Sequence, residues 1–250
     1  MCFDVDSAPP VAAIAGAAVS HEDLTLRSAD GTEFAAFSAA PDAPNGSGVV
    51  ILPDVRGLYS FYEELALRFA ERGYAAVALD YFGRTAGVDK RPNDWNFMEH
   101  VNQTTPDQIR DDTAAAVAHV RMAGAQRVFT VGFCFGGRMS WLAAADGHGL
   151  AGAVGFYGKP GVRQERPGPV QRASEIGAPI LALMAGDDHG IGPDEVAELD
   201  RALEAAGVEH EVVTYEGAPH SFFDRKQDEF ADASEDAWRR TLEFLERHAR

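Results

Sequence analysis

Apolar residues follow two kinds of pattern along the chain. From His21 to Ala39, apolar and polar residues alternate around Asp30-Gly31. This predicts an antiparallel hairpin, because the side chains of a strand alternate between its two faces. Further along, the alternation gives way to short continuous apolar runs, which are typical of strands buried on both faces of a parallel sheet. These runs lie at 49–52, 75–79, 128–131, 153–157, 180–184 and 211–215.

Segments with the helical spacing of apolar residues separate these runs, at 62–72, 107–122, 194–206 and 234–248. At the start of the second, Thr105, Pro106 and Gln108 stand where an N-cap, a first helical residue and the partner of a capping box are expected. Strands that alternate with helices predict one α/β domain, whose mostly parallel sheet has helices on both faces. We expect residues 1–20 to form an N-terminal extension and residues 21–250 to form this domain.

The composition is that of an ordinary globular protein, with 46% hydrophobic and 24% charged residues. A net charge of −17 repels nucleic-acid phosphates and anionic lipids, so we expect neither nucleic acid nor a membrane as partner. No apolar run approaches the roughly 20 residues that span a bilayer. Asp4 and Asp6 stand where a secretory signal would be basic. A cytoplasmic protein is expected, with Cys2 and Cys134 as free thiols.

Two segments, 84–104 and 159–172, carry no clear periodicity. Loops of this length in a compact domain are often functional. The first contains Trp95 and Phe97, and we expect it to wall a pocket. The second carries four basic residues in an otherwise acidic chain, so it is either a solvated basic loop or an anion site.

The most specific chemical signal is the run Gly132-Phe133-Cys134-Phe135-Gly136-Gly137. It joins a predicted strand to a predicted helix at 138–145, and so sharp a turn requires glycines around a nucleophile that points out of the sheet. A thiol there faces a helix N-terminus, whose partial positive charge favours the thiolate. We expect Cys134 to be the nucleophile of a hydrolase with an α/β-hydrolase fold. The alternative is a small buried thiol without a chemical role.

A thiol nucleophile needs a base and an acid, and in this fold the acid precedes the histidine in the chain. His220 lies in the loop after the last predicted strand, where the histidine is expected. The acid should follow the run 180–184, where Asp187 and Asp188 are adjacent and periodicity does not choose between them. Backbone N–H groups of Phe135 and of a residue within 53–57 would form the oxyanion hole. No metal or organic cofactor is expected.

From Val49 to Leu245 the chain resembles the dienelactone hydrolase family, which consists of α/β-hydrolases with a Cys-Asp-His triad. The resemblance rests on the cysteine-centred turn, on Gly-x-Asp-His at 186–189 and on Gly-x-Pro-His-Ser-Phe at 217–222. It implies that Asp188 is the triad acid and that Val55 provides the second oxyanion N–H. It also implies that Asp54 interacts with the resting thiol, although the family has a longer glutamate at this position.

The resemblance further implies that Arg84 binds a substrate carboxylate. The family's second carboxylate-binding arginine falls where this chain has Asp224, and Arg225 follows it. Tyr157 completes the candidate substrate-binding residues. The implied activity is hydrolysis of carboxylic ester or lactone bonds in small molecules, of the carboxymethylenebutenolidase type. A broader esterase or thioesterase, and a non-catalytic ligand-binding member, are the alternatives. We expect a monomer or a homodimer.

Overall fold

One sheet of eight strands runs through the part of the chain that the computed structural model describes, residues 4, 6–92 and 95–250. The order across the sheet is β1-β2-β4-β3-β5-β6-β7-β8. The β1–β2 and β2–β4 pairs are antiparallel and the pairs from β4 to β8 are parallel, which confirms the predicted hairpin and mostly parallel sheet. The strands are β1 (Val19–Arg27), β2 (Glu33–Pro41), β3 (Ser47–Leu52), β4 (Ala75–Leu79), β5 (Arg127–Phe133), β6 (Gly152–Phe156), β7 (Ile180–Asp187) and β8 (His210–Pro219).

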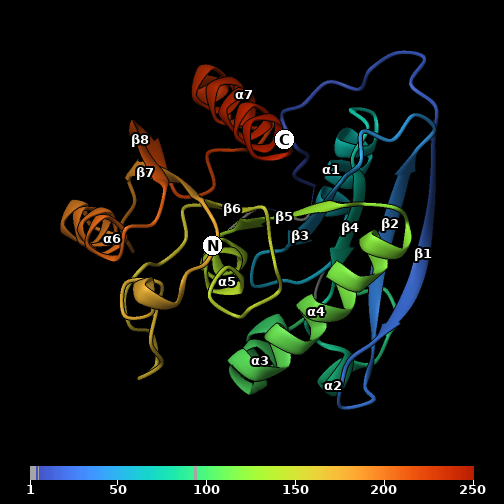
Figure 1. Ribbon diagram of the computed structural model, residues 1–250, viewed down its shortest axis with the longest axis horizontal. Helices are drawn as coiled ribbons and strands as arrows, with labels where there is room; N and C mark the ends of the chain where they lie inside the picture. Colours follow the sequence, from blue (N-terminus) through green and yellow to red (C-terminus); the bar gives the residue numbers. More distant parts are fainter. Residues whose placement is uncertain (1–3, 5, 93–94) are drawn as a thin grey trace.

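Helices cover both faces of this sheet (Figure 1). On one face, Phe61 of α1 and Phe244 of α7 belong to the same apolar cluster. On the other face, α5 supplies Met139 to a cluster shared with α4 and Trp141 to a cluster shared with α6. The helices are α1 (Ser60–Ala70), α2 (Gly83–Ala86), α3 (Phe97–Gln103), α4 (Pro106–Met122), α5 (Phe135–Ala143), α6 (Pro193–Ala206) and α7 (Ala231–His248), with short 3₁₀ turns at Ala173–Glu175 and Asp228–Phe230.

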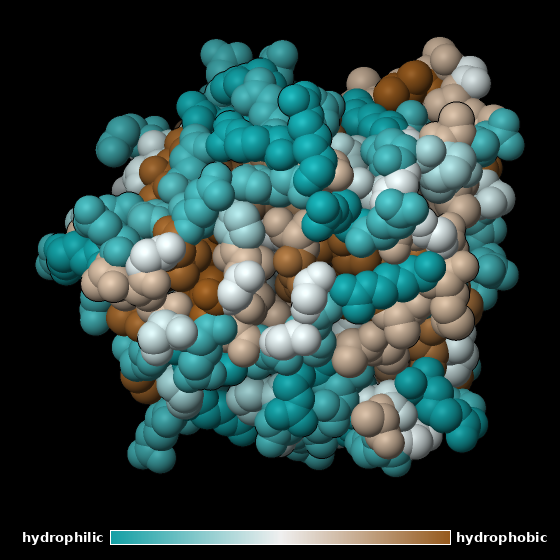
Figure 2. Space-filling view, in the orientation of Figure 1, coloured by the Kyte–Doolittle hydropathy of each residue, from teal (hydrophilic) through white to brown (hydrophobic). Residues whose placement is uncertain are grey.

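Burial explains the two apolar patterns along the chain. Every residue of β3 and β4 is buried, because these central strands have helices on both sides. Strand β1 lies at the edge of the sheet and most of its residues are exposed or partly exposed, which is why its sequence alternates. Figure 2 shows mainly hydrophilic residues on the face in view, with smaller hydrophobic areas between them.

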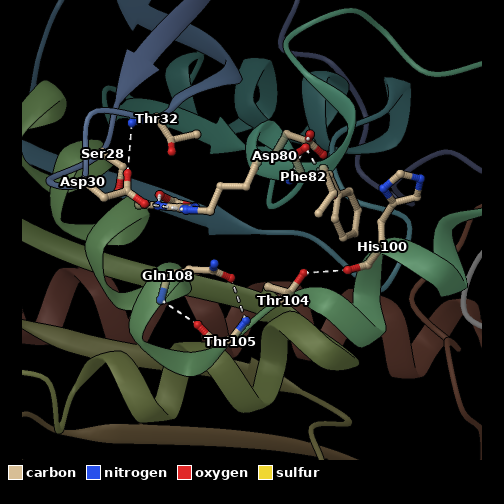
Figure 3. Close-up of polar contacts among 12 residues, drawn as sticks. Ser28, Asp30, Thr32, Asp80, Phe82, His100, Thr104, Thr105 and Gln108 are labelled. Atoms are coloured by element: carbon tan, nitrogen blue, oxygen red, sulfur yellow. Dashed lines mark hydrogen bonds and ion pairs between the residues drawn. The ribbon is translucent and has the colours of Figure 1, made fainter.

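The capping box at the start of α4 is present as predicted. The Thr105 N–H donates to Gln108 Oε1 at 2.9 Å, and the Gln108 N–H donates to Thr105 Oγ1 at 3.3 Å (Figure 3). These two bonds satisfy N–H groups that have no partner within the helix. Helix α3 ends at Gln103 and α4 begins at Pro106. Between them, the Thr104 hydroxyl donates to the His100 carbonyl at 2.9 Å.

Residues 7–11, which precede β1, pack against the rest of the molecule. Ser7, Pro9 and Val11 are buried, and Val11 belongs to the same apolar cluster as α1 and α7. Strand β1 begins at Val19, and the division of the chain at residue 20 stays a prediction. Cys2 lies outside the described residues. In the described ranges, no helix combines the length and apolarity that crossing a membrane requires.

Candidate active site

Cys134 occupies a strained turn between β5 and α5. Its φ is 55° and its ψ is −112°, a conformation that residues other than glycine rarely adopt. The Cys134 N–H donates to the Phe156 carbonyl at 2.9 Å, and its carbonyl accepts from the Arg138 N–H at 3.2 Å. These bonds hold the turn from both sides. Strained backbone of this kind concentrates at functional sites.

The three glycines of the turn are required by close backbone packing. A Cβ added to Gly132 would lie 1.9 Å from the Gly136 carbonyl oxygen, and one added to Gly136 would lie 1.9 Å from that of Leu52. At Gly137 an added Cβ would lie 2.5 Å from the Phe156 carbonyl oxygen. The start of α5 therefore rests directly on the ends of β3 and β6, which brings Phe135 next to the loop that follows β3.

That loop contains Val55, the second candidate oxyanion donor. Phe135 is the first residue of α5, where helix N–H groups have no partner within the helix. Among the described residues, neither the Phe135 N–H nor the Val55 N–H has a hydrogen-bond acceptor. Val55, Phe135 and Cys134 also belong to the same apolar cluster. Two free donors next to a candidate nucleophile are what an oxyanion hole requires.

Asp188 and His220 meet at the same edge of the sheet, after β7 and at the end of β8. His220 Nδ1 lies 2.6 Å from Asp188 Oδ2, and the Gly190 N–H donates to Asp188 Oδ1 at 2.8 Å. Burial disfavours the charge of Asp188, but the hydrogen bond and the attraction from His220 outweigh it, so the Asp188 pKa lies below 3.8. The carboxylate form makes Nδ1 the protonated nitrogen of the ring. Asp187 is exposed.

Tyr157 lies between the nucleophile turn and the histidine. Its ring centroid is 4.8 Å from that of His220 and 6.4 Å from that of Phe133, and its side chain is fully buried. Its φ of 38° is a second unusual backbone conformation at this edge, and its N–H donates to the Leu183 carbonyl at 2.8 Å. The structure thus brings Tyr157 to the site, where its ring contacts His220.

Asp54 is completely buried in the loop that follows β3, next to Val55; we call this loop, residues 53–57, the oxyanion loop. Its Oδ1 accepts from the Arg56 N–H at 2.8 Å, and its Oδ2 accepts from the Tyr59 hydroxyl at 3.3 Å. Burial raises the pKa of Asp54, and the nearby Arg56 opposes this rise. Tyr81 has a pKa raised well above 10, first by burial and then by the charges of Asp54, Asp80 and Cys134. The Tyr81 hydroxyl donates to the Pro53 carbonyl at 2.8 Å and its ring centroid lies 5.3 Å from that of Phe135, so Tyr81 lies beside both Asp54 and the nucleophile turn.

Arg84 is held by side chains from distant elements. Its guanidinium donates to both carboxylate oxygens of Asp112, at 2.7 and 2.9 Å, and to Asp30 Oδ2 at 2.8 Å. A further bond of 2.9 Å reaches the Ser28 hydroxyl, and Figure 3 shows Ser28 and Asp30 side by side. Two carboxylates therefore neutralise Arg84 between α4 and the β1–β2 turn, and its expected role in substrate binding stays a prediction.

Arg225 is turned toward the N-terminal residues. Its guanidinium donates to Glu64 Oε1 at 2.7 Å and to the Pro9 carbonyl at 3.1 Å, and the side chain is 56% exposed. The neighbouring Asp224 is buried and accepts from the Ser7 hydroxyl at 2.6 Å. The 224–225 pair therefore holds residues 7–9, and the expected substrate-binding role of Arg225 stays a prediction.

Arg138 on α5 is a buried residue that the sequence did not single out. Its guanidinium donates to the carbonyls of Lys159 at 2.9 Å, Arg166 at 3.2 Å and Pro167 at 2.8 Å, and to that of Gly161. Burial lowers the pKa of Arg138 to about 10, and Arg163 contributes to this shift. Carbonyl acceptors leave no signature in the sequence, so nothing pointed to this role. The segment 159–172 is thereby fastened to the helix that carries the nucleophile.

A cavity of about 660 Å³ lies beside Val55. Trp95 and Phe97 line it, which confirms that the segment 84–104 walls a pocket. Arg56 and Arg91 line it as well, and neither was singled out from the sequence.

The parallel sheet, the strained cysteine turn and the Asp188–His220 pair together define a hydrolase with the α/β-hydrolase fold. A family model described as "Dienelactone hydrolase family" matches residues 34–249. The chain belongs to the dienelactone hydrolase family.

Individual relatives cover nearly the whole chain. A carboxymethylenebutenolidase of Rhodococcus opacus is 30% identical over 257 residues, which cover 99% of this chain and 97% of the relative. A crystal structure of a protein from Klebsiella pneumoniae, provisionally assigned as a dienelactone hydrolase, is 29% identical with a TM-score of 0.80, over 91% of this chain and 98% of the other. A dienelactone hydrolase-like promiscuous phosphotriesterase from metagenomic libraries is 22% identical with a TM-score of 0.74, over 92% and 99%, and shares the fold.

Proposed function

We propose that this protein hydrolyses carboxylic ester or lactone bonds in small molecules with a triad of Cys134, His220 and Asp188. The observation that carries the proposal is the 2.6 Å contact between Asp188 and His220 at the sheet edge where the strained Cys134 turn also lies. Family membership and the carboxymethylenebutenolidase name of the Rhodococcus opacus relative support the same chemistry.

In the first half of the reaction, His220 Nε2 takes the proton of the Cys134 thiol, and the sulfur attacks the carbonyl carbon. The Asp188 carboxylate stabilises the imidazolium that forms. The Phe135 and Val55 N–H groups hold the negative oxygen of the tetrahedral intermediate. When this intermediate collapses, the carbon–oxygen bond of the ester breaks, the leaving oxygen takes the proton from His220, and a thioester remains on Cys134.

In the second half, His220 takes a proton from water while the water oxygen attacks the thioester carbonyl. The same two N–H groups hold the second oxyanion. Collapse breaks the carbon–sulfur bond, returns the proton to the cysteine sulfur and releases the carboxylic acid. No group outside this chain is consumed except water.

A broader esterase or thioesterase is the second candidate for the same triad. The ion pairs of Arg84 with Asp112 and of Arg225 with Glu64 favour it, because both arginines expected to bind a substrate carboxylate are already engaged. For Asp54, we propose that it shapes the oxyanion loop through its contacts with Arg56 and Tyr59. A cytoplasmic location fits the mechanism, which requires a reduced thiol at Cys134. A monomer or a homodimer could carry out this reaction.

The test is hydrolysis of a small activated ester, 4-nitrophenyl acetate, by wild type and Cys134→Ala. We expect the rate to fall by about 10⁴-fold or more, because removal of a triad nucleophile leaves only the oxyanion hole and binding. Cys2→Ala is the matched control and should keep full activity. Iodoacetamide should inactivate wild type in parallel with alkylation of Cys134. Equal hydrolysis by Cys134→Ala and wild type would rule out the proposed nucleophile.

A further inference from the structure

Val55, the second proposed oxyanion donor, lines the cavity described above, so the cavity adjoins the loop that follows β3. Its volume of about 660 Å³ falls in the range of small-molecule sites, roughly 300 to 1,000 Å³. If the Val55 N–H holds the oxygen of the substrate carbonyl, we expect one of the two groups attached to the carbonyl carbon to extend along the cavity wall that Val55 forms. The cavity is large for a small lactone, so its size indicates a bulky substituent.

The cavity has a fixed aromatic wall. Trp95, Phe97 and Tyr59 line it, together with Leu58 and Ala35. The Trp95 ring packs 5.0 Å from Phe82 and 4.6 Å from His100 between centroids, which holds it in place without a ligand. The Phe82 and His100 rings are themselves neighbours, with centroids 6.0 Å apart (Figure 3). Flat aromatic surfaces bind flat apolar groups well.

The basic residues that line the cavity are already paired. Arg91 lies 2.9 Å from the buried Asp80, and Lys90 lies 3.0 Å from Glu63. Arg56 lies 3.6 Å from Asp54 and stacks on Tyr59. These three basic residues are outnumbered by the acidic ones in the lining, which are Asp4, Asp6, Glu63, Asp80 and Asp89. A negatively charged ligand would therefore meet repulsion rather than an unpaired cation.

From these observations we infer that the cavity binds an uncharged aromatic or similarly bulky group of the substrate. The enzyme then prefers neutral, bulky esters to small lactones that carry a carboxylate. This inference rests on the proposed function, because it uses Val55 as an oxyanion donor.

Two matched pairs of esters test the size and the charge of the preferred group. The first pair compares a naphthyl with a methyl substituent, placed in turn on the acyl side and on the alcohol side. The second pair compares 4-nitrophenyl pentanoate with the 4-nitrophenyl monoester of glutaric acid, whose chain ends in a carboxylate. For the second pair, we expect kcat/KM to be at least about tenfold higher for the neutral ester. For the first pair, we expect the naphthyl ester to be preferred when the naphthyl group is on one of the two sides, acyl or alcohol.

Ala35→Phe locates the subsite, because Ala35 lines the cavity and its backbone carbonyl still accepts from the Asp80 N–H. We expect it to lower the ratio of kcat/KM for the naphthyl ester to that for the methyl ester by about tenfold or more. Ala118→Phe, at an exposed position on α4, is the control and should leave this ratio unchanged.

The outcomes separate the two proposals. If Cys134→Ala keeps its activity, the proposed function fails whatever Ala35→Phe does. If Cys134→Ala is inactive but Ala35→Phe leaves the ratio unchanged, or the carboxylate ester is hydrolysed as well as the neutral one, the assignment of the cavity is overturned and the triad stands.

Discussion

The nucleophile turn and the cavity beside it are built by different means. The turn is defined by main-chain packing, since Gly132 and Gly136 have no room for a Cβ against neighbouring carbonyls. The cavity is defined largely by long side chains, and its two arginines and its lysine each pair with a carboxylate, two of the three on another segment of the chain. The chemistry therefore depends on backbone positions that tolerate little change. Recognition depends on side-chain pairs that a single substitution can rearrange.

The largest effect should come from the acid at the sheet edge. Asp188→Asn removes the carboxylate that orients His220, and we expect kcat to fall by about 10⁴-fold, as for the equivalent change in other triads. The adjacent Asp187→Asn is the control and should stay within about twofold of wild type, because Asp187 is exposed. Steady-state kinetics on 4-nitrophenyl acetate measures both. If the two variants exchanged their effects, the triad acid would be Asp187.

Among the side-chain pairs, the one between Arg84 and Asp112 should matter most for stability, because Arg84→Ala leaves the buried Asp112 without its partner. We expect the free energy of unfolding to fall by about 3 to 5 kcal/mol, the usual cost of breaking a buried pair. Urea unfolding measures this loss. Arg27→Ala breaks an exposed pair with Glu33 and should cost less than about 1 kcal/mol. A rise in the KM of Arg84→Ala that is confined to carboxylate-bearing esters would show that Arg84 binds the substrate.

The close main-chain packing of the turn is tested by Gly136→Ala, which places a methyl group against the Leu52 and Pro53 carbonyls. We expect a loss of about 3 kcal/mol in the free energy of unfolding, because backbone atoms on both sides have little room to move. Gly177→Ala is the control, since its nearest neighbour would lie 3.9 Å away, and it should change stability by less than about 0.5 kcal/mol. Equal stability of the two variants would show that the turn tolerates side chains.

Arg225→Ala should have a small effect. The side chain is 56% exposed and its pair with Glu64 is at the surface, so we expect a loss of about 0.5 kcal/mol. We expect kcat/KM for both neutral and carboxylate-bearing esters to stay within about twofold of wild type. A selective loss of activity on the carboxylate-bearing ester would show that Arg225 reaches the substrate after all.

Acidification offers a gradual test of the Asp188–His220 contact. The folded-state pKa of Asp188 is lowered from 3.8, so its ionised form contributes stability that is complete above the unfolded value. This contribution is lost as the pH falls through the folded value. Urea unfolding of wild type and Asp188→Asn between pH 6 and pH 3 should therefore show a stability difference that shrinks at the acid end. A difference that grows there would contradict the lowered pKa.

The sequence predicts what depends on local geometry. The turn at Cys134 could be recognised because sharp turns need glycine, and Thr105 with Gln108 because a capping box has fixed spacing. The apolar runs located the core strands, and β3 and β4 are buried on both faces as expected, whereas the last run, 211–215, lies in the edge strand β8 and is only partly buried. The roles of Cys134, Asp188 and His220 in catalysis stay predictions, although the structure places the last two in contact.

The sequence could not predict which partners the long side chains reach. Arg84 binds Asp112, 28 residues away, and Arg225 binds the Pro9 carbonyl, 216 residues away, so only the folded chain brings them together. Helix α3 was missed for another reason. Its span, Phe97–Gln103, is about two turns, which is too short for a helical period to stand out.

The four carbonyl bonds of Arg138 affect how this family member can evolve. Every amino acid supplies a carbonyl, so these four bonds do not depend on which side chains the 159–167 segment carries. Substitutions can accumulate there while the loop keeps its course over the nucleophile helix. Sequence changes in this loop could then alter the surface near the reaction centre without loss of the fold, as long as Arg138 is retained.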